Sequence, residues 1–208
     1  MNKKYFYLIA STFLFLATAC SKDDPTPEID QEEISLASLT FTEVERELHN
    51  DHYHYNAIEN GDVEVIEFGN NGLAPSGIHL DLEVGKTYKV ALLAKDFAGR
   101  ETQQTFLERH ETHQAFLIGA PSETLEYVYA DRDAQNKKIN VGVTGYLTVL
   151  KKSDKFLFSY ILRHLNEGVK STIAATDWNN ANYNKFTGAN DLELKVEVHL
   201  LDADDHDH

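Results

Sequence analysis

The fold class is indicated by residues 78–92, IHLDLEVGKTYKVAL, in which apolar and polar residues alternate. Every second residue from Ile78 to Val84 is apolar, which places four apolar side chains on one face of a strand. Gly85 and Lys86 then predict a turn, and the alternation resumes from Tyr88 to Leu92. The stretch therefore predicts a β-hairpin of the kind found in immunoglobulin-like sandwiches.

Short apolar runs between Gly, Asn and Asp clusters recur along the chain and predict further strands. The run Phe156–Leu162 is apolar on both faces, which favours a central strand, whereas the last run alternates cleanly from Leu192 to Leu200. Besides the hairpin, the segments expected as strands are 37–44, 63–68, 125–129, 141–150, 156–163 and 192–201. The sequence thus predicts an all-β fold, an immunoglobulin-like antiparallel β-sandwich, over residues 36–202.

One segment, Glu101–Gln114, interrupts the strand pattern, because it contains no Gly, Pro or Val. The segment has apolar or half-apolar residues at Phe106, His110 and His113, and Leu117 follows it. These four residues are spaced at i, i+4, i+7 and i+11. That spacing lies on one stripe of a helix. We therefore expect one short helix, with His110 and His113 on the same face.

The chain begins with the features of a secretory leader. Two lysines precede the apolar run Tyr5–Leu16, which has the length of a signal-peptide core and is too short to span a membrane. The run leads into Leu16-Ala17-Thr18-Ala19-Cys20, which resembles a lipobox, where the leader of a lipoprotein is cleaved and the cysteine receives lipid chains. We expect residues 1–19 to be a signal peptide and Cys20 to be the lipidated N-terminus.

The residues after Cys20 indicate where the anchored protein would lie. Residues 20–35 are rich in acids, contain two prolines and have few apolar side chains, so they predict a flexible tether. The segment Ser21-Lys22-Asp23-Asp24 resembles the short tag that sends Bacteroidota lipoproteins across the outer membrane to the cell surface. The alternative is an ordinary solvated linker, and in either case lipid chains would hold the protein at a membrane.

Charge and cysteine content restrict the possible partners and chemistry. The formal net charge is −15, and loss of Lys3 and Lys4 with the leader would lower it by two, to −17. Such a charge repels nucleic acid and anionic lipid. Cys20 is the only cysteine, so a lipidated chain has no disulfide, thiolate metal ligand or cysteine nucleophile. A metal site would therefore use histidines and carboxylates.

Four stretches give the chain a family resemblance. They are Glu111–Phe116, Tyr129–Asn136, Leu162–His164 and Asp191–Leu200. Together they resemble a family of uncharacterised Bacteroidota outer-membrane or surface lipoproteins that are predicted beside TonB-dependent receptors. The resemblance spans roughly residues 36–202 and implies a β-sandwich with a role beside a transport receptor. The chain departs from the family in its many histidines.

Ten histidines are present, and three groups of them are candidate transition-metal ligands. His49, His52 and His54 lie within six residues, where a strand would put the last two on one face and a loop would let all three converge. The expected helix would place His110 and His113 where two imidazoles can reach one ion. His164, at the end of a central strand, would supply a third ligand. These residue types predict zinc or copper.

Each histidine group also has a purely structural interpretation. The cluster from His49 to His54 could be a solvated strand edge, and the helical pair could be half-buried histidines bonded to backbone carbonyls. His79, His164 and His199, each taken singly, would be structural. The tail, residues 203–208, is acidic and contains two histidines, so it predicts either solubilising disorder or weak metal capture.

Two further segments resemble sites for other ligands, a calcium ion and a glycan. Asp131 and Asp133 resemble the start of a calcium loop, but the Gly and the later Glu of such a loop are missing, so calcium is not expected and a β-turn is favoured. Trp178 and Tyr183 flank a segment rich in asparagine that suits glycan stacking. The alternative for Trp178 is a place in the core of the sandwich.

No motif for catalysis is present: the sequence has no nucleophile elbow, phosphate loop, dinucleotide fingerprint or His-Glu-x-x-His. We therefore expect a binding protein and not an enzyme. The first hypothesis is a lipid-anchored surface protein that captures zinc or copper as an accessory to outer-membrane uptake. The second is a surface module that binds glycans or takes part in assembly without a metal.

Overall fold

The computed structural model describes residues 34–206, which fall within one compact unit, Gln31–His208. In these residues the strands are β1 (Leu36–His49), β2 (His52–Ala57), β3 (Val63–Phe68), β4 (His79–Glu83), β5 (Thr87–Lys95), β6 (His113–Ile118), β7 (Leu125–Tyr129), β8 (Thr144–Val149), β9 (Ser153–Leu165) and β10 (Gly188–Leu201). The α-helix is α2 (Gln103–Glu108), and short 3-10 helices are η1 (Val169–Thr172), η2 (Ala175–Asn179), η3 (Tyr183–Lys185) and η4 (Ala203–His206). The predicted leader, Cys20 and most of the predicted tether lie outside the described residues, as do the last two residues of the tail.

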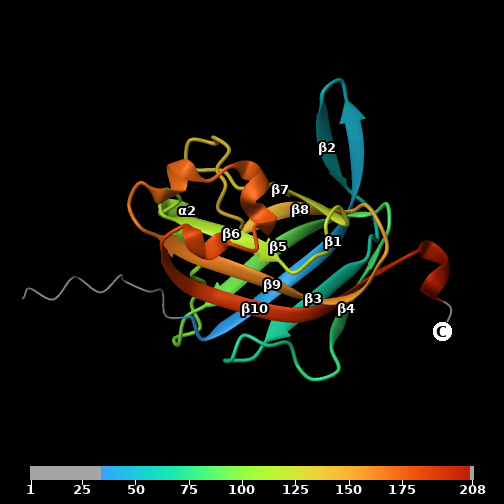
Figure 1. The fold of residues 1–208 in the computed structure, drawn as a ribbon, viewed down its shortest axis with the longest axis horizontal. Coiled ribbons are helices and arrows are strands. Elements are labelled where there is room, and N and C mark those ends of the chain that lie inside the picture. Colours follow the sequence, from blue (N-terminus) through green and yellow to red (C-terminus); the bar gives the residue numbers. More distant parts are fainter. Residues whose placement is uncertain (1–33, 207–208) are drawn as a thin grey trace, which may run out of the picture. The chain divides into compact units, whose positions relative to one another are not determined.

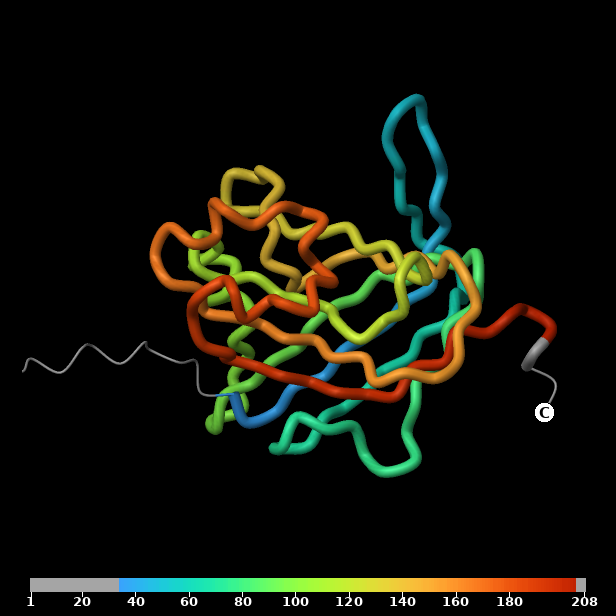
Figure 2. Tube along the Cα trace, viewed as in Figure 1, coloured from blue at the N-terminus to red at the C-terminus, as the bar shows by residue number. Residues whose placement is uncertain are grey.

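The strands form two sheets packed face to face, so the predicted all-β sandwich with one short helix is confirmed (Figure 1). One sheet has the order β2-β1-β5-β8-β7, with β3 also paired to β1, and the other has the order β4-β10-β9-β6. The first half of β1 pairs with β3 and its second half with β2. That second half and β2 form the β1–β2 hairpin, which projects beyond the sandwich (Figure 2).

The main core fills the space between the two sheets. Inward side chains of both sheets meet there, among them Leu39 and Val90 from one sheet and Phe158 and Val196 from the other. A smaller cluster, built on Phe116, Leu165 and Phe186, lies apart from it. The partly buried residues packed on this cluster come largely from the segment between β9 and β10. Among the described helices, none is long and apolar enough to cross a membrane.

The hairpin predicted at residues 78–92 is wrong, although both of its strands exist. β4 pairs in parallel with β10, whereas β5 pairs with β1 and β8 in the other sheet. The turn at Gly85, which has a φ of +86°, therefore crosses from one sheet to the other. Alternation tells only which face of a strand is buried, and both strands do bury their apolar face in the same core.

The predicted helix is also shorter than expected, because the chain turns at residues 109–112 and continues as a strand. α2 ends at Glu108, and from His113 the chain pairs with β9 as β6. Phe106 and His113 are both buried, as a helical stripe would predict, but they lie on opposite sides of the turn at residues 109–112. They are buried because their rings pack against each other at the same end of the sandwich. β2 and β6 were not predicted as strands from the sequence.

Candidate metal centre

Three side chains from neighbouring strands converge at one end of the four-stranded sheet: His113 of β6, His164 of β9 and Asp191 of β10. Their ligand atoms all lie within 4.8 Å of one another. His113 and His164 are directly paired across the two strands, with ring centroids 4.6 Å apart. Each histidine follows the strand alternation of core residues two positions away, Ala115 and Leu162, so both imidazoles face the interior.

Asp191 joins them because of an irregularity in β10. Asn190 pairs with Arg163 and Leu192 pairs with Leu162, so Asp191 is an extra residue between two consecutive pairs. Such a β-bulge re-aims a side chain that regular alternation would send elsewhere. Here the side chain of Asp191 is 0 % exposed and its Oδ2 lies 3.1 Å from Nε2 of His113.

The hydrogen bonds leave metal-binding atoms facing one another. Nδ1 of His113 lies 3.0 Å from the carbonyl oxygen of Arg109, to which it can donate. The hydroxyl of Thr112 also lies 3.3 Å from Nδ1. In a neutral imidazole that donates from Nδ1, the lone pair is on Nε2, as in many metal-ligating histidines. The contact of Nε2 with Asp191 lacks hydrogen-bond geometry, and neither oxygen of Asp191 accepts a hydrogen bond from the described residues.

A surrounding shell holds these ligands in place. The ring of Phe106 in α2 lies 5.3 Å from the ring of His113, which is itself 0 % exposed. Lys170 of η1 donates to the backbone carbonyls of His110 and His113 and so fixes the start of β6. Burial lowers the pKa of the Lys170 ammonium to about 8, and the nearby Asp131 carboxylate opposes that shift.

Arg163 supports the bulge from the other side of the strand. Its guanidinium donates to Oδ1 of Asn190 at 2.5 Å and to the carbonyl of Gly188 at 2.8 Å. These bonds fix the residue immediately before Asp191. Arg163 is buried, and desolvation lowers the pKa of its guanidinium, while the charge of Asp191 raises it. The Asp191 carboxylate thus has a cation nearby but no hydrogen bond from it.

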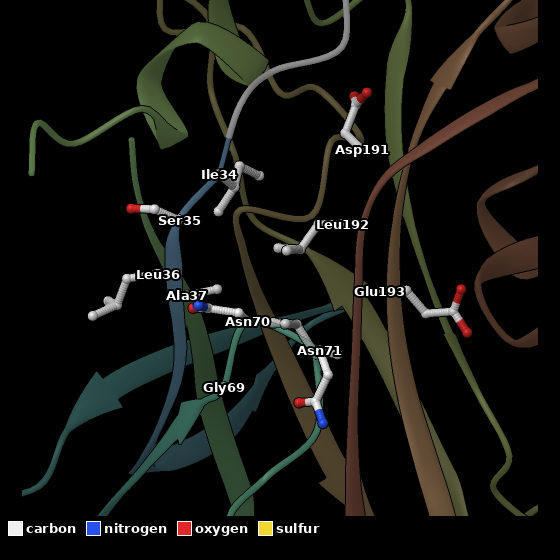
Figure 3. A pocket seen from close by; sticks show the side chains of 12 residues that line it. Ile34, Ser35, Leu36, Ala37, Gly69, Asn70, Asn71, Asp191, Leu192 and Glu193 are labelled. Carbon is white, nitrogen blue, oxygen red and sulfur yellow. The ribbon is translucent and has the colours of Figure 1, made fainter. Parts of the chain in front are cut away.

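Asp191 is one of the residues that line a pocket on the sandwich. This pocket is lined by the start of β1, by the loop from Gly69 to Gly72 and by residues 191–194 of β10 (Figure 3). Asp191 stands at one end of this pocket, and its carboxylate points away from the other labelled side chains. His113 and His164 do not line this pocket.

The structure brings together only part of the predicted metal ligands. His113 and His164 meet, but His110 lies in the turn after α2, so the predicted pairing of His110 with His113 on one helical face is wrong. The third ligand, Asp191, was not predicted. In the sequence it is one acidic residue before an alternating strand, and no local pattern distinguishes it from a solvated residue.

The cluster of His49, His52 and His54 lies at the tip of the β1–β2 hairpin, and all three are exposed. His52 and His54 share a face of β2, as predicted for a strand, with their Nε2 atoms 3.0 Å apart. The ring of His49 lies 5.0 Å from that of His54. Nδ1 of His52 lies 3.2 Å from Oδ1 of Asp51, but no three ligand atoms of this segment lie within 4.8 Å of one another in the described part of the chain, which supports its interpretation as a solvated strand edge.

The carboxylates of the proposed calcium loop have other roles. Oxygens of Asp131 accept backbone N–H groups of Gly142 at 2.5 Å and Thr144 at 2.7 Å. Burial raises the pKa of this carboxyl to about 6, and the backbone hydrogen bonds oppose the shift. Asp133 accepts the N–H groups of Gln135 and Lys137 within its own turn. The geometry is that of the favoured β-turn.

The two aromatic residues proposed for glycan stacking pack on the protein itself. Trp178 is half-buried against the main core, with its ring 5.8 Å from that of Tyr127. Tyr183 is half-buried against the smaller cluster, 5.9 Å from Phe116. The two rings thus pack on different clusters. The packing of Trp178 on the main core supports its interpretation as a core residue.

Comparison with known proteins adds no assignment: no protein-family model matches the chain, and no curated protein matches it either. The functional conclusion therefore depends on the geometry of the site, and the lipoprotein family resemblance stays a prediction.

Proposed function

We propose that this protein binds one transition-metal ion, zinc or copper, through His113, His164 and Asp191. The observation that supports the proposal is the buried Asp191 carboxylate, which accepts no hydrogen bond from the described residues and lies beside two imidazoles. A buried polar group left unpaired costs about 1 to 3 kcal/mol, and a charge costs more. A divalent cation among the three ligands would remove that cost.

The ligand set matches the chemistry of these ions. Two neutral imidazoles and one carboxylate form a three-ligand site of the kind that binds zinc and leaves a coordination position for another group. The hydrogen bond from His113 to the Arg109 carbonyl orients the ring so that Nε2 points at Asp191. Because the ligands are enclosed, exchange of the ion with solvent is expected to be slow.

The ligand assignment is tested by zinc titration calorimetry at neutral pH. All variants carry His206→Ala and His208→Ala, so that the tail does not contribute heat. His113→Ala is expected to lower the zinc stoichiometry by one ion, because a two-ligand site binds weakly. His110→Ala is the matched control and is expected to leave the stoichiometry unchanged, because His110 lies outside the ligand set.

Circular dichroism of each variant checks that the strands remain folded. A folded His113→Ala variant with undiminished stoichiometry would exclude this site. Loss of binding in His110→Ala alone would instead restore the pairing of His110 with another ligand.

We also propose that the chain acts at the outer membrane, anchored through Cys20 and facing the cell exterior, as an accessory to metal uptake beside a TonB-dependent receptor. The lipobox-like sequence before Cys20 supports the anchor, and the strongly acidic composition argues against a nucleic-acid partner. Cys20→Ala is expected to release the protein from the outer-membrane fraction or leave it unprocessed with its leader. Fractionation followed by mass measurement checks this, and unchanged membrane association would contradict the anchor.

A further inference from the structure

A second group of metal-binding side chains lies on β4 and the far end of β10. In the parallel pairing of these strands, His79 lies opposite Glu197 and Asp81 lies opposite His199. Leu80, Leu82 and Val198 between them face the core, so these four polar side chains share the outer face of the sheet. The ligand atoms of His79, Asp81 and His199 all lie within 4.8 Å of one another.

In His199, as in His113, one ring nitrogen can donate a hydrogen bond and the other lies beside a carboxylate. Its Nε2 lies 3.2 Å from Oε1 of Glu197 with hydrogen-bond geometry, so this nitrogen can donate its proton there. Its Nδ1 lies 3.1 Å from Oδ1 of Asp81, but that carboxylate oxygen is buried and accepts no hydrogen bond from the described residues. In a neutral imidazole that donates from Nε2 to Glu197, the lone pair on Nδ1 of His199 faces Oδ1 of Asp81.

The position of the other histidine extends this arrangement. The rings of His79 and His199 are stacked, with centroids 4.7 Å apart and an interplanar angle of 18°. Nε2 of His79 lies 3.5 Å from the second oxygen of Asp81. One cation placed among the three residues would take one ligand atom from each of them.

We propose that His79, Asp81 and His199 bind a second transition-metal ion, with Glu197 orienting His199. Zinc and copper accept this set of imidazole and carboxylate ligands. Unlike the buried centre, this site is open to solvent: the side chains of His79, Asp81 and His199 are 45 %, 37 % and 27 % exposed. The ion it holds is therefore expected to exchange rapidly.

The two sites are far enough apart to be independent. Asp191 and His199 are eight residues apart on β10, and a strand advances about 3.3 Å per residue, which gives roughly 26 Å. The proposal goes beyond the buried centre, because no ligand is shared between the two sites. The exposed site and the enclosed site can thus be distinguished by the rates at which they release zinc.

The test is release of zinc from the loaded chain to an excess of a chromogenic chelator, followed by stopped-flow absorbance. The chain carries His206→Ala and His208→Ala, and two phases of one ion each are expected. His199→Ala is expected to remove only the fast phase, and Asp191→Asn only the slow phase. His54→Ala is the matched control for an exposed histidine and is expected to change neither.

The outcomes separate the two proposals. A fast phase that is absent from the parent chain, or that persists at full amplitude in His199→Ala and in His79→Ala, overturns the exposed site. A fast phase that is lost in His54→Ala assigns it to the β1–β2 hairpin and also overturns the exposed site. A missing slow phase beside an intact fast phase refutes the buried centre and leaves the exposed site supported.

Discussion

Zinc at 100 times the dissociation constant of the buried centre is expected to raise the free energy of unfolding by about 2.7 kcal/mol, and Asp191→Asn is expected to abolish this gain. The first effect is mass action, since the ligands converge only in the folded chain. The second follows because the amide is nearly isosteric with the carboxylate but carries no charge to bind the cation. Asp191 makes no hydrogen bond within the described residues that the substitution would break.

Urea unfolding with and without zinc measures both effects. Asp81→Asn is the matched control, because it replaces the carboxylate of the exposed group and leaves the buried ligands intact. The competing explanation is a buried ion pair between protonated His113 and Asp191. Removing one partner of such a pair costs about 3 to 5 kcal/mol without any metal. A large loss in zinc-free Asp191→Asn, together with no zinc effect on the parent chain, would establish the ion pair instead.

Arg163→Met is expected to lower the zinc affinity of the buried centre by about 10- to 100-fold, the usual effect of removing a group that orients a ligand. Arg163 contacts none of the three ligands through a hydrogen bond. It holds Asn190 and the Gly188 carbonyl, and thereby the bulge that presents Asp191. Methionine keeps much of the side-chain volume and removes the donors.

Competition with a chelator of known affinity measures this change in variants first shown to be folded. Arg46→Met is the matched control, because Arg46 is a largely buried arginine of β1 that pairs with Glu126, away from the site. Arg163→Lys retains the charge without the planar set of donors and is expected to give an intermediate affinity. Unchanged affinity in a folded Arg163→Met variant would show that the bulge does not depend on this side chain.

Local patterns in the sequence predicted much of the fold, because strand alternation depends only on which face is buried. They gave β3 and β7 with their observed bounds and placed β9 and β10 within a few residues. They could not give strand partners, which depend on contacts between distant residues. For this reason the stretch around Gly85 was predicted as a hairpin, although it connects the two sheets.

The candidate site was likewise predicted only in part, because its residues could be picked out singly but their contacts depend on strand pairing. His113 and His164 were found because histidines are rare enough to be noticed one by one. Their meeting could not be predicted, because it depends on the pairing of β6 with β9, and the start of β6 was expected to be helical. Asp191 was missed because its orientation is produced by a bulge, and a bulge is defined by the partner strand. His79 and His199 were each expected to be structural, and Asp81 was missed, because β4 and β10 pair across a long separation in sequence.

The extra residue in β10 also tells how this protein should be compared with its relatives. Asn190 and Leu192 pair with consecutive residues of β9, so a chain one residue shorter at this point would pair without this bulge and keep the sandwich. It would keep both histidines as well, and an alignment scored by identity would count it as equivalent. It would nevertheless lack the inward carboxylate. The length of the segment between Gly188 and Leu192, more than the presence of the two histidines, is therefore the character that should separate relatives with the site from those without it.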